Sequence, residues 1–316
     1  MECRVLGLFK QASAGKGRIG LAFGDNQVAI AVMRREGGSP VLERCELLPL
    51  VGPERAPEAA AEALRAAELP RMPVSTVLGD QDYQLALVEA PDVPPAELRA
   101  AMRWRLKDTI DFRVEDAVID VFDVPDQNRG GHGRMMYAVA ARRSAVERYT
   151  QTLSGLSAFD VIDVPELCLR NLAALLPAAG AGVALLNLGQ KSANIVLVRG
   201  KTFYLARHME LLAVKSRADH KPGDEVDAAG VVLELQRSLD YYERHFDQPP
   251  ITRIAVSPAG PRAAALAADL GRETGLEVTT LDLNQLLACG RPIEPDAQAS
   301  CLLAVGAALR EESRSL

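Results

Sequence analysis

The sequence predicts an α/β protein made of two similar halves, with a small subdomain inserted into the first half. Two observations predict this fold class. Segments with a strand pattern alternate with segments of helical pattern, most clearly after residue 160. In addition, residues 21–34 align without a gap with residues 186–199, 165 positions further on, and share leucine, glycine, isoleucine and arginine at matching positions. Both segments are typical of a strand, a glycine turn and a second strand, which favours an internal duplication.

The composition is that of an ordinary globular protein. The chain has 316 residues, which suits about two domains, and 48% of them are hydrophobic and 25% charged. This excludes collagen, a mucin-like stalk and wholesale disorder. The 42 acidic residues outnumber the 36 basic ones, so a global basic field is absent and no nucleic-acid partner is expected. The five cysteines are widely spaced and the four histidines are scattered, which argues against a disulfide framework or a metal centre.

The first half carries most of its predicted strands before residue 90. Alternating apolar residues and turn residues predict strands at residues 19–32 (two strands around Gly24), 41–48, 74–78, 83–89, 118–124 and 135–141. Helices are predicted at residues 58–67, from Pro94 to about 107, and at 144–156 with Ser144 as N-cap. The glycine-rich residues 126–133 predict a loop.

The second half repeats this alternation. Strands are predicted at residues 161–164, 183–188, 194–198, 202–206, 251–256 and 278–281. Helices are predicted at residues 166–176, 224–246, 261–274 and 301–310. We therefore predict a flexible tail at residues 1–17, a first domain at 18–160 with an insertion at about 75–150, and a second domain at 161–316. No run of about 18 apolar residues exists, so no membrane-spanning helix is expected.

The two glycine turns are candidates for a phosphate-binding site, since glycine lets backbone N–H groups approach an anion closely. On these residues alone, two ordinary hairpins are the better interpretation. The nucleotide-binding candidates from both turns and from a later short loop are Gly24, Asp25, Asn26, Asn187, Gly189, Gln190, Lys191, Ser192 and Gly260.

Three further segments carry a more specific resemblance. Residues 234–243 (ELQRSLDYYE), residues 163–166 (DVPE) and residues 303–310 (LAVGAALR) closely resemble PilM-type pilus-assembly proteins of the actin-like superfamily. Within that group the chain is most similar to the MshI branch of MSHA-type pilus systems. The resemblance implies a duplicated, RNase H-like actin fold, with Gly306 at a close packing of the last helix.

This chain departs from the superfamily at the residues that support phosphoryl transfer. Both turns of the superfamily carry D-x-G, whose carboxylates order Mg²⁺ and the attacking water. This chain has Ala22 and Asn187 at those positions. Since phosphoryl transfer depends on that positioning and charge, we expect no catalytic residues, no metal site and no required cofactor. ATP binding is expected to be weak or vestigial.

The resemblance also implies a partner. PilM-type proteins bind a short cytoplasmic N-terminal segment of an inner-membrane assembly protein, in a groove of the first domain. The matching region is residues 74–141, where an extended peptide could lie near a sheet edge. The anchor candidates are Tyr83, Leu85, Leu87 and Trp104, with Arg103 and Arg105 beside them; we expect the Trp104 indole itself to be buried in the helix stripe.

Three functions therefore stay open. The first is a non-catalytic, cytoplasmic scaffold of an MSHA-like type IV pilus machine, associated with the inner membrane through its partner and open to self-association. The second is an active ATPase of the same machine. The third is an actin-fold small-molecule kinase. Because a fold hosts many functions, the missing acidic residues at positions 22 and 187 are what favour the first.

Overall fold

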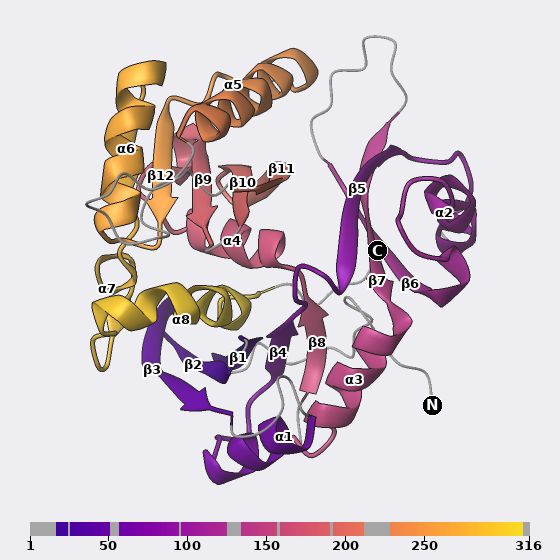
Figure 1. Cartoon of the computed structure of the whole chain (residues 1–316), viewed down its shortest axis with the longest axis vertical. Coiled ribbons are helices and arrows are strands. Elements are labelled where there is room, and N and C mark those ends of the chain that lie inside the picture. Colours follow the sequence, from indigo (N-terminus) through magenta and orange to yellow (C-terminus); the bar gives the residue numbers. More distant parts are fainter. Residues whose placement is uncertain are drawn as a thin grey trace, which may run out of the picture.

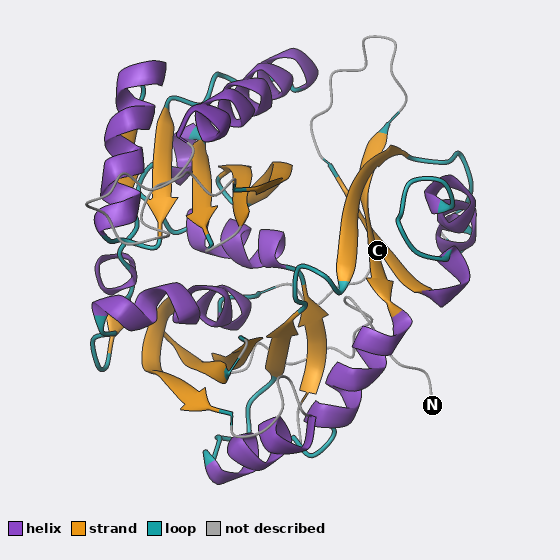
Figure 2. Cartoon of the chain, in the orientation of Figure 1, coloured by secondary structure: helices purple, strands orange, loops and turns teal. Residues whose placement is uncertain are grey.

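The computed structural model describes residues 17–24, 26–50, 57–94, 96–124, 134–156, 159–189, 192–211 and 228–311. Over these residues the chain forms three β-sheets with helices packed around them (Figures 1 and 2). Residues 1–16 of the predicted tail and the predicted loop at 126–133 lie outside the described residues, whereas Gly17, the last residue of the predicted tail, begins the first strand.

The first sheet belongs mainly to the first half. Its six strands lie in the order β14-β3-β2-β1-β4-β8. Their bounds are β1 Gly17–Phe23, β2 Gln27–Glu36, β3 Ser39–Pro49, β4 Val74–Val77, β8 Phe159–Asp163 and β14 Ala288–Cys289. β1, β2 and β3 are antiparallel, whereas β4 and β8 continue the sheet parallel to β1.

The second sheet repeats this arrangement. Its five strands lie in the order β11-β10-β9-β12-β13, with three antiparallel strands followed by two parallel ones. Their bounds are β9 Val183–Leu188, β10 Ser192–Arg199, β11 Thr202–Glu210, β12 Arg253–Ser257 and β13 Glu277–Thr280. The strands β3-β2-β1-β4-β8 therefore correspond one by one to β11-β10-β9-β12-β13, which confirms the predicted duplication.

The helices pack on the faces of the sheets. They are α1 Pro57–Ala66, α2 Leu98–Leu106, α3 Arg143–Leu153, α4 Pro165–Ala173, α5 Ala228–His245, α6 Pro261–Thr274, α7 Leu283–Leu286 and α8 Pro295–Ala308. In β2, the larger residues Val28, Ile30 and Val32 share a core with α1 and α3. The alternate residues, including Ala29 and Ala31, face the core that contains α8. This two-sided burial explains why β2 is almost continuously apolar.

The last helix of each half packs on the other half. α8 lies across β1, β2, β3 and β4, and α4 packs against β9, β10 and β11. A side-chain carbon on Gly306 would lie 2.5 Å from the Cys168 carbonyl oxygen, and one on Gly20 would lie 1.9 Å from that of Ala304. Only glycine fits at either crossing, as the resemblance implied for Gly306.

The inserted subdomain is smaller than predicted. It is a three-stranded sheet in the order β5-β7-β6, from β5 Tyr83–Glu89, β6 Ala117–Asp123 and β7 Met135–Arg142, with α2 on one face (Figure 1). β4, which we placed in the insertion, is buried inside the first sheet between β1 and β8. α3 connects the insertion to the first sheet, because it packs on α1 and β8 and also on β6 and β7.

Other sequence predictions are also corrected. The predicted domain boundary between residues 160 and 161 falls inside β8. β14, from the second half of the sequence, pairs with β3 in the first sheet, because strands that are distant in sequence can be neighbours in a sheet. α3 begins at Arg143, and no side chain caps it, so Ser144 is not the N-cap. α8 begins at Pro295 rather than residue 301, because a proline suits the first helical turn.

Candidate functional site

The two glycine turns are equivalent in the structure. The Gly24 N–H donates to the Gln27 carbonyl at 2.8 Å and closes the β1–β2 hairpin. The Gly189 N–H donates to the Ser192 carbonyl, also at 2.8 Å, and closes the β9–β10 hairpin. Both bonds join residues that the sequence repeat had matched. The predicted hairpins therefore occupy the same place in the two halves.

The other nucleotide-binding candidates are placed as follows. Asp25, Gln190 and Lys191 lie outside the described residues. Asn26 is exposed, and its carbonyl accepts a hydrogen bond from the Leu50 N–H at 2.8 Å.

The late loop lies close to the second hairpin. Gly260 directly precedes α6, and Arg262 in the first turn of that helix donates to the Gly189 carbonyl at 2.6 Å. The Ser192 hydroxyl donates to a carboxylate oxygen of Asp80 at 3.4 Å. The structure thus brings Gly189, Ser192 and Gly260 together in one region.

The hairpin residues do not fit a bound Mg²⁺. Mg²⁺ in phosphoryl-transfer sites is held by carboxylates and phosphates. Position 22 carries only a methyl group, and the Asn187 amide oxygen already accepts a hydrogen bond from the Ser257 hydroxyl at 3.2 Å. Within the described part of the chain, no three His, Cys, Asp or Glu side chains are grouped so that they could hold a metal ion.

A buried ion pair joins the two halves near the end of β8. Arg310, two residues after α8, donates to an Asp163 carboxylate oxygen at 2.6 Å, and the Asp163 side chain is fully buried. The Asn171 side chain donates to the Gly306 carbonyl at 2.9 Å and ties α4 to α8. Breaking a buried pair leaves an uncompensated charge, so these contacts fix the relative position of the halves.

A groove of about 750 Å³ lies between the inserted subdomain and the second half. One wall is formed by β5 and β7 and the other by β11, with Tyr241 of α5 beside it. Figure 1 shows β5 on the side of the inserted subdomain that faces the second half, with α2 on the far side. The aromatic rings of Phe122, Tyr137 and Phe203 hold the two walls together, with centroids 5.2–5.7 Å apart.

A buried carboxyl lies at one end of this groove. Glu166, in the first turn of α4, is 4% exposed and accepts a hydrogen bond from the Tyr83 hydroxyl at 2.7 Å. Burial raises the pKa of Glu166 to about 7, against the smaller lowering by Tyr83. Burial also raises the pKa of Tyr83 well above its ordinary value, so the phenol stays a hydrogen-bond donor.

The predicted anchor residues are divided between two places. Tyr83, Leu85 and Leu87 line the groove, although Tyr83 is buried and its hydroxyl is engaged. Arg103, Trp104 and Arg105 instead lie on α2, and none of them lines the groove.

The expected burial of Trp104 is wrong. Its side chain is 79% exposed, because Met102 and Leu106 form the buried face of α2. The neighbouring arginines hold the subdomain together. Arg103 donates to the Val114 carbonyl at 2.9 Å, and Arg105 lies 3.4 Å from a Glu89 carboxylate oxygen.

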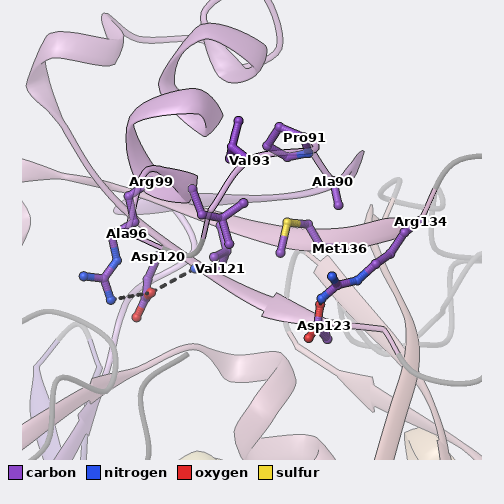
Figure 3. Close-up of a pocket in the computed structure, with 11 residues that line it drawn as sticks. Ala90, Pro91, Val93, Ala96, Arg99, Asp120, Val121, Asp123, Arg134 and Met136 are labelled. Carbon is purple, nitrogen blue, oxygen red and sulfur yellow. Dashed lines mark hydrogen bonds and ion pairs between the residues drawn. The ribbon is translucent and has the colours of Figure 1, made fainter.

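A second hollow, of about 500 Å³, lies on the other side of the inserted sheet, beside β6 and the segment before α2 (Figure 3). Asp120 faces it, accepts from Arg99 at 3.3 Å and also from the Val121 N–H at 2.9 Å. Burial raises the pKa of Asp120 to about 6, although both partners lower it. Arg134 and Asp123 form a second ion pair at its rim.

Comparison with known proteins identifies the fold of the chain. No protein-family model matches the sequence, and no curated protein matches it significantly. Among solved structures, the PilM–PilN type IV pilus biogenesis complex contains a chain that is 20% identical, with 94% of this chain and 98% of that chain covered and a TM-score of 0.68. A Bacteroides thetaiotaomicron protein with an actin-like ATPase fold and unknown function is 9% identical, with 94% and 99% covered and a TM-score of 0.50.

The chain has the actin-like fold. The duplicated sheets, the matching hairpins and the exchanged helices α4 and α8 are thus parts of one known architecture. Among the described residues, no helix of this actin-like chain is long and apolar enough to span a membrane.

Sequence reasoning missed the second wall of the groove and the chemistry of Glu166. The carboxylate at position 166 carried a signal, since it follows a proline at the start of an apolar helix. The β11 wall carried none, because Arg207, His208 and Glu210 are the ordinary polar residues of an edge strand.

Proposed function

We propose that this actin-like chain is a non-catalytic scaffold of a type IV pilus assembly machine of the MSHA kind. The observation that carries the proposal is the chemistry at the two hairpins. A methyl group at position 22 and a hydrogen-bonded amide at Asn187 stand where the superfamily places its two carboxylates. Without them, positioning of Mg²⁺ and of an attacking water lacks its usual ligands.

The partner in this proposal is an inner-membrane assembly protein. The similar chain belongs to a solved complex of PilM with PilN. We propose that this chain binds the cytoplasmic N-terminal segment of its own PilN counterpart, at the groove beside β5. Such a scaffold would lie in the cytoplasm and reach the inner membrane through that partner.

Nucleotide binding tests the scaffold part of the proposal. Calorimetry with ATP, with and without Mg²⁺, should give weak or no binding, and steady-state phosphate release should stay at background. Phosphate release that disappears in a Gly189→Trp variant would favour the active ATPase instead. Release only in the presence of a small-molecule acceptor would favour the kinase.

Peptide binding tests the partner. Calorimetry with a synthetic peptide of the PilN counterpart's cytoplasmic segment should show saturable binding. A scrambled peptide of the same composition is the control, since it keeps charge and hydrophobicity. Equal binding of both peptides, or of neither, would contradict the proposed partner.

A further inference from the structure

Trp104 protrudes from α2 into solvent. Its side chain is 79% exposed, and among the described residues the only other large apolar side chain that stands exposed is Leu233, at 47%. Ala100 and Ala101, one helical turn before Trp104, have side chains too small to cover the indole. Neither of the two hollows described above is lined by Trp104. An indole that contributes so little to the core is available to a surface outside the chain.

The fold holds this side chain outward. Met102 and Leu106 are buried and fix the opposite face of α2 on the inserted sheet. α2 itself lies on the far side of that sheet from the second half (Figure 1). Trp104 therefore stands on a packed helix at the outside of the subdomain, and it can meet a flat surface without any rearrangement of the chain.

The helix that carries Trp104 is basic, although the net charge of the whole chain is −6. Residues 97–108 contain four basic side chains and two acidic ones, Glu97 and Asp108, which stand at the two ends of the segment. No acidic residue lies between them in the sequence. The segment therefore attracts an anionic surface more strongly than a neutral one.

Three of these basic side chains lie close to Trp104 and keep charge available. Arg103 donates to two backbone carbonyl oxygens, which are neutral groups, so these bonds leave its charge in place. Lys107 is exposed at the C-terminal end of α2. Arg105 lies 3.4 Å from a Glu89 carboxylate oxygen, but the two side chains are 43% and 52% exposed, so this ion pair is weak and exchangeable.

From these observations we infer that the α2 surface around Trp104 contacts an anionic lipid bilayer directly. Tryptophan is enriched at membrane interfaces, because its ring is apolar and its N–H group stays hydrated there. Arginine and lysine bring positive charge to the lipid phosphates, while their aliphatic stems lie along the apolar boundary. A fluid lipid surface also accepts a protruding side chain without a preformed pocket, whereas a protein partner would have to supply one.

This contact is weak by itself. One tryptophan and three basic side chains make a small anchor, and stable attachment to a membrane takes more than one signal. The contact adds to the proposed attachment through an inner-membrane partner, because a chain already held at the membrane meets lipid at a high effective concentration. The inference does not depend on that partner, so vesicles alone can test it.

Tryptophan fluorescence tests the inference at the side chain itself. Trp104 is the only tryptophan of the chain, so the emission reports on no other residue. The probe is a suspension of phosphatidylglycerol and phosphatidylethanolamine vesicles, and phosphatidylcholine vesicles without net charge are the control. The anionic vesicles should move the emission to shorter wavelength and protect it from acrylamide, a quencher dissolved in the water. Raising the ionic strength to about 1 M should remove most of this effect, because the Debye length then falls to about 3 Å.

Two double variants separate the charge of α2 from charge elsewhere. Arg105→Gln combined with Lys107→Gln should lower the affinity for anionic vesicles, measured by co-sedimentation, by about tenfold or more, since each basic residue near the surface adds attraction. The control is Arg237→Gln combined with Arg244→Gln on α5, where the side chains are 60% and 77% exposed. It removes the same number of charges far from α2 and should change the affinity by less than about twofold.

A third variant removes the indole. Trp104→Ala should lower the affinity for anionic vesicles about five- to tenfold, because the apolar surface that enters the interface is lost. Trp104→Phe should keep part of that affinity, since an aromatic ring remains. Unaltered affinity in Trp104→Ala would contradict the role of this side chain.

The remaining outcomes are equally decisive. Unshifted emission with anionic vesicles at low ionic strength would overturn the inference and leave the proposed function standing, because peptide binding is measured without lipid. Vesicle binding with unshifted emission would also overturn it, since the lipid would then meet another surface of the chain. A shift caused by the PilN counterpart's peptide and not by vesicles would make Trp104 a protein-binding residue instead. Equal binding to both kinds of vesicle would contradict the charge part of the inference.

Discussion

The two edges of the inserted sheet differ in whether side chains cover their outward-pointing backbone N–H and C=O groups. The β6 edge is covered by arginines and by Asp120, whereas the β5 edge faces a groove whose far wall belongs to the other half. An uncovered edge invites pairing with another chain, so proteins usually protect it. Among the described residues, side chains therefore cover outward backbone groups at the β6 edge, whereas the β5 edge lies along a groove.

The groove exists only while its two walls keep their places, so the largest expected effect comes from disturbing the junction of the halves. In a Gly306→Val variant the first side-chain carbon would lie 2.5 Å from the Cys168 carbonyl oxygen. Backbone on both sides of this contact cannot yield easily. We expect a loss of more than about 3 kcal/mol in the free energy of unfolding, measured by urea titration.

The matched control is Gly155→Ala, where an added carbon meets nothing within 4 Å. Its free energy of unfolding should change by less than about 0.5 kcal/mol. A Gly306→Val variant as stable as this control would mean that α4 and α8 do not cross as described.

The next effect concerns Glu166, the buried carboxyl beside the open edge. Its pKa rises from an ordinary 4.5 to about 7 on folding, chiefly through burial. The folded chain therefore holds this proton more tightly than the unfolded chain. The resulting stability is fully present below pH 4.5 and is lost as the pH rises through 7.

Urea titrations at several pH values measure this contribution. Glu166 should account for a fall of about 3 kcal/mol in the free energy of unfolding over that window, and Glu166→Gln should lack it. The exposed Glu115→Gln should keep the wild-type pH dependence. If Glu166→Gln kept it too, the carboxyl would not be protonated in the folded groove.

Removal of the Asp120 side chain, which covers the β6 edge, should destabilise the protein. Asp120→Ala leaves the Val121 N–H without its acceptor and Arg99 without its partner. We expect a loss of about 1–2 kcal/mol in the free energy of unfolding, together with concentration-dependent self-association through β6. Thermal unfolding and light scattering measure the two effects.

Asp123→Ala is the control for that prediction. Asp123 pairs with Arg134, but the two side chains are 40% and 63% exposed, so the ion pair is worth little. We expect the free energy of unfolding of this variant to change by less than about 0.5 kcal/mol, and we expect no self-association. If both variants stayed monomeric, the cap on β6 would not be what prevents pairing.

The sequence predicted the fold well because its signals were local. Strand and helix patterns, and the match of residues 21–34 to 186–199, each depend on short segments. The site was harder because it depends on distant segments. Leu85 and Leu87 were predicted, yet their groove needs β11, more than 100 residues later. The prediction that the Trp104 indole is buried was wrong, because a helix with alternating apolar and basic residues is compatible with either a buried or an exposed indole.

The smallest expected effect decides which of the predicted anchors belong to the groove. Leu87 lines the groove at the open edge, whereas Trp104 is 79% exposed on α2, which packs on the opposite face of the sheet. Leu87→Ala should weaken binding of the peptide about tenfold, since a half-buried leucine contributes on the order of 1–2 kcal/mol. Trp104→Ala should change neither peptide affinity nor the free energy of unfolding by more than about 0.5 kcal/mol, because exposed side chains away from an interface contribute little to either. Calorimetry on the two variants at matched protein concentration measures the difference. A reversed order, with Trp104→Ala as the damaging variant, would move the partner from the β5 edge to the α2 surface, where Arg103 and Arg105 also lie.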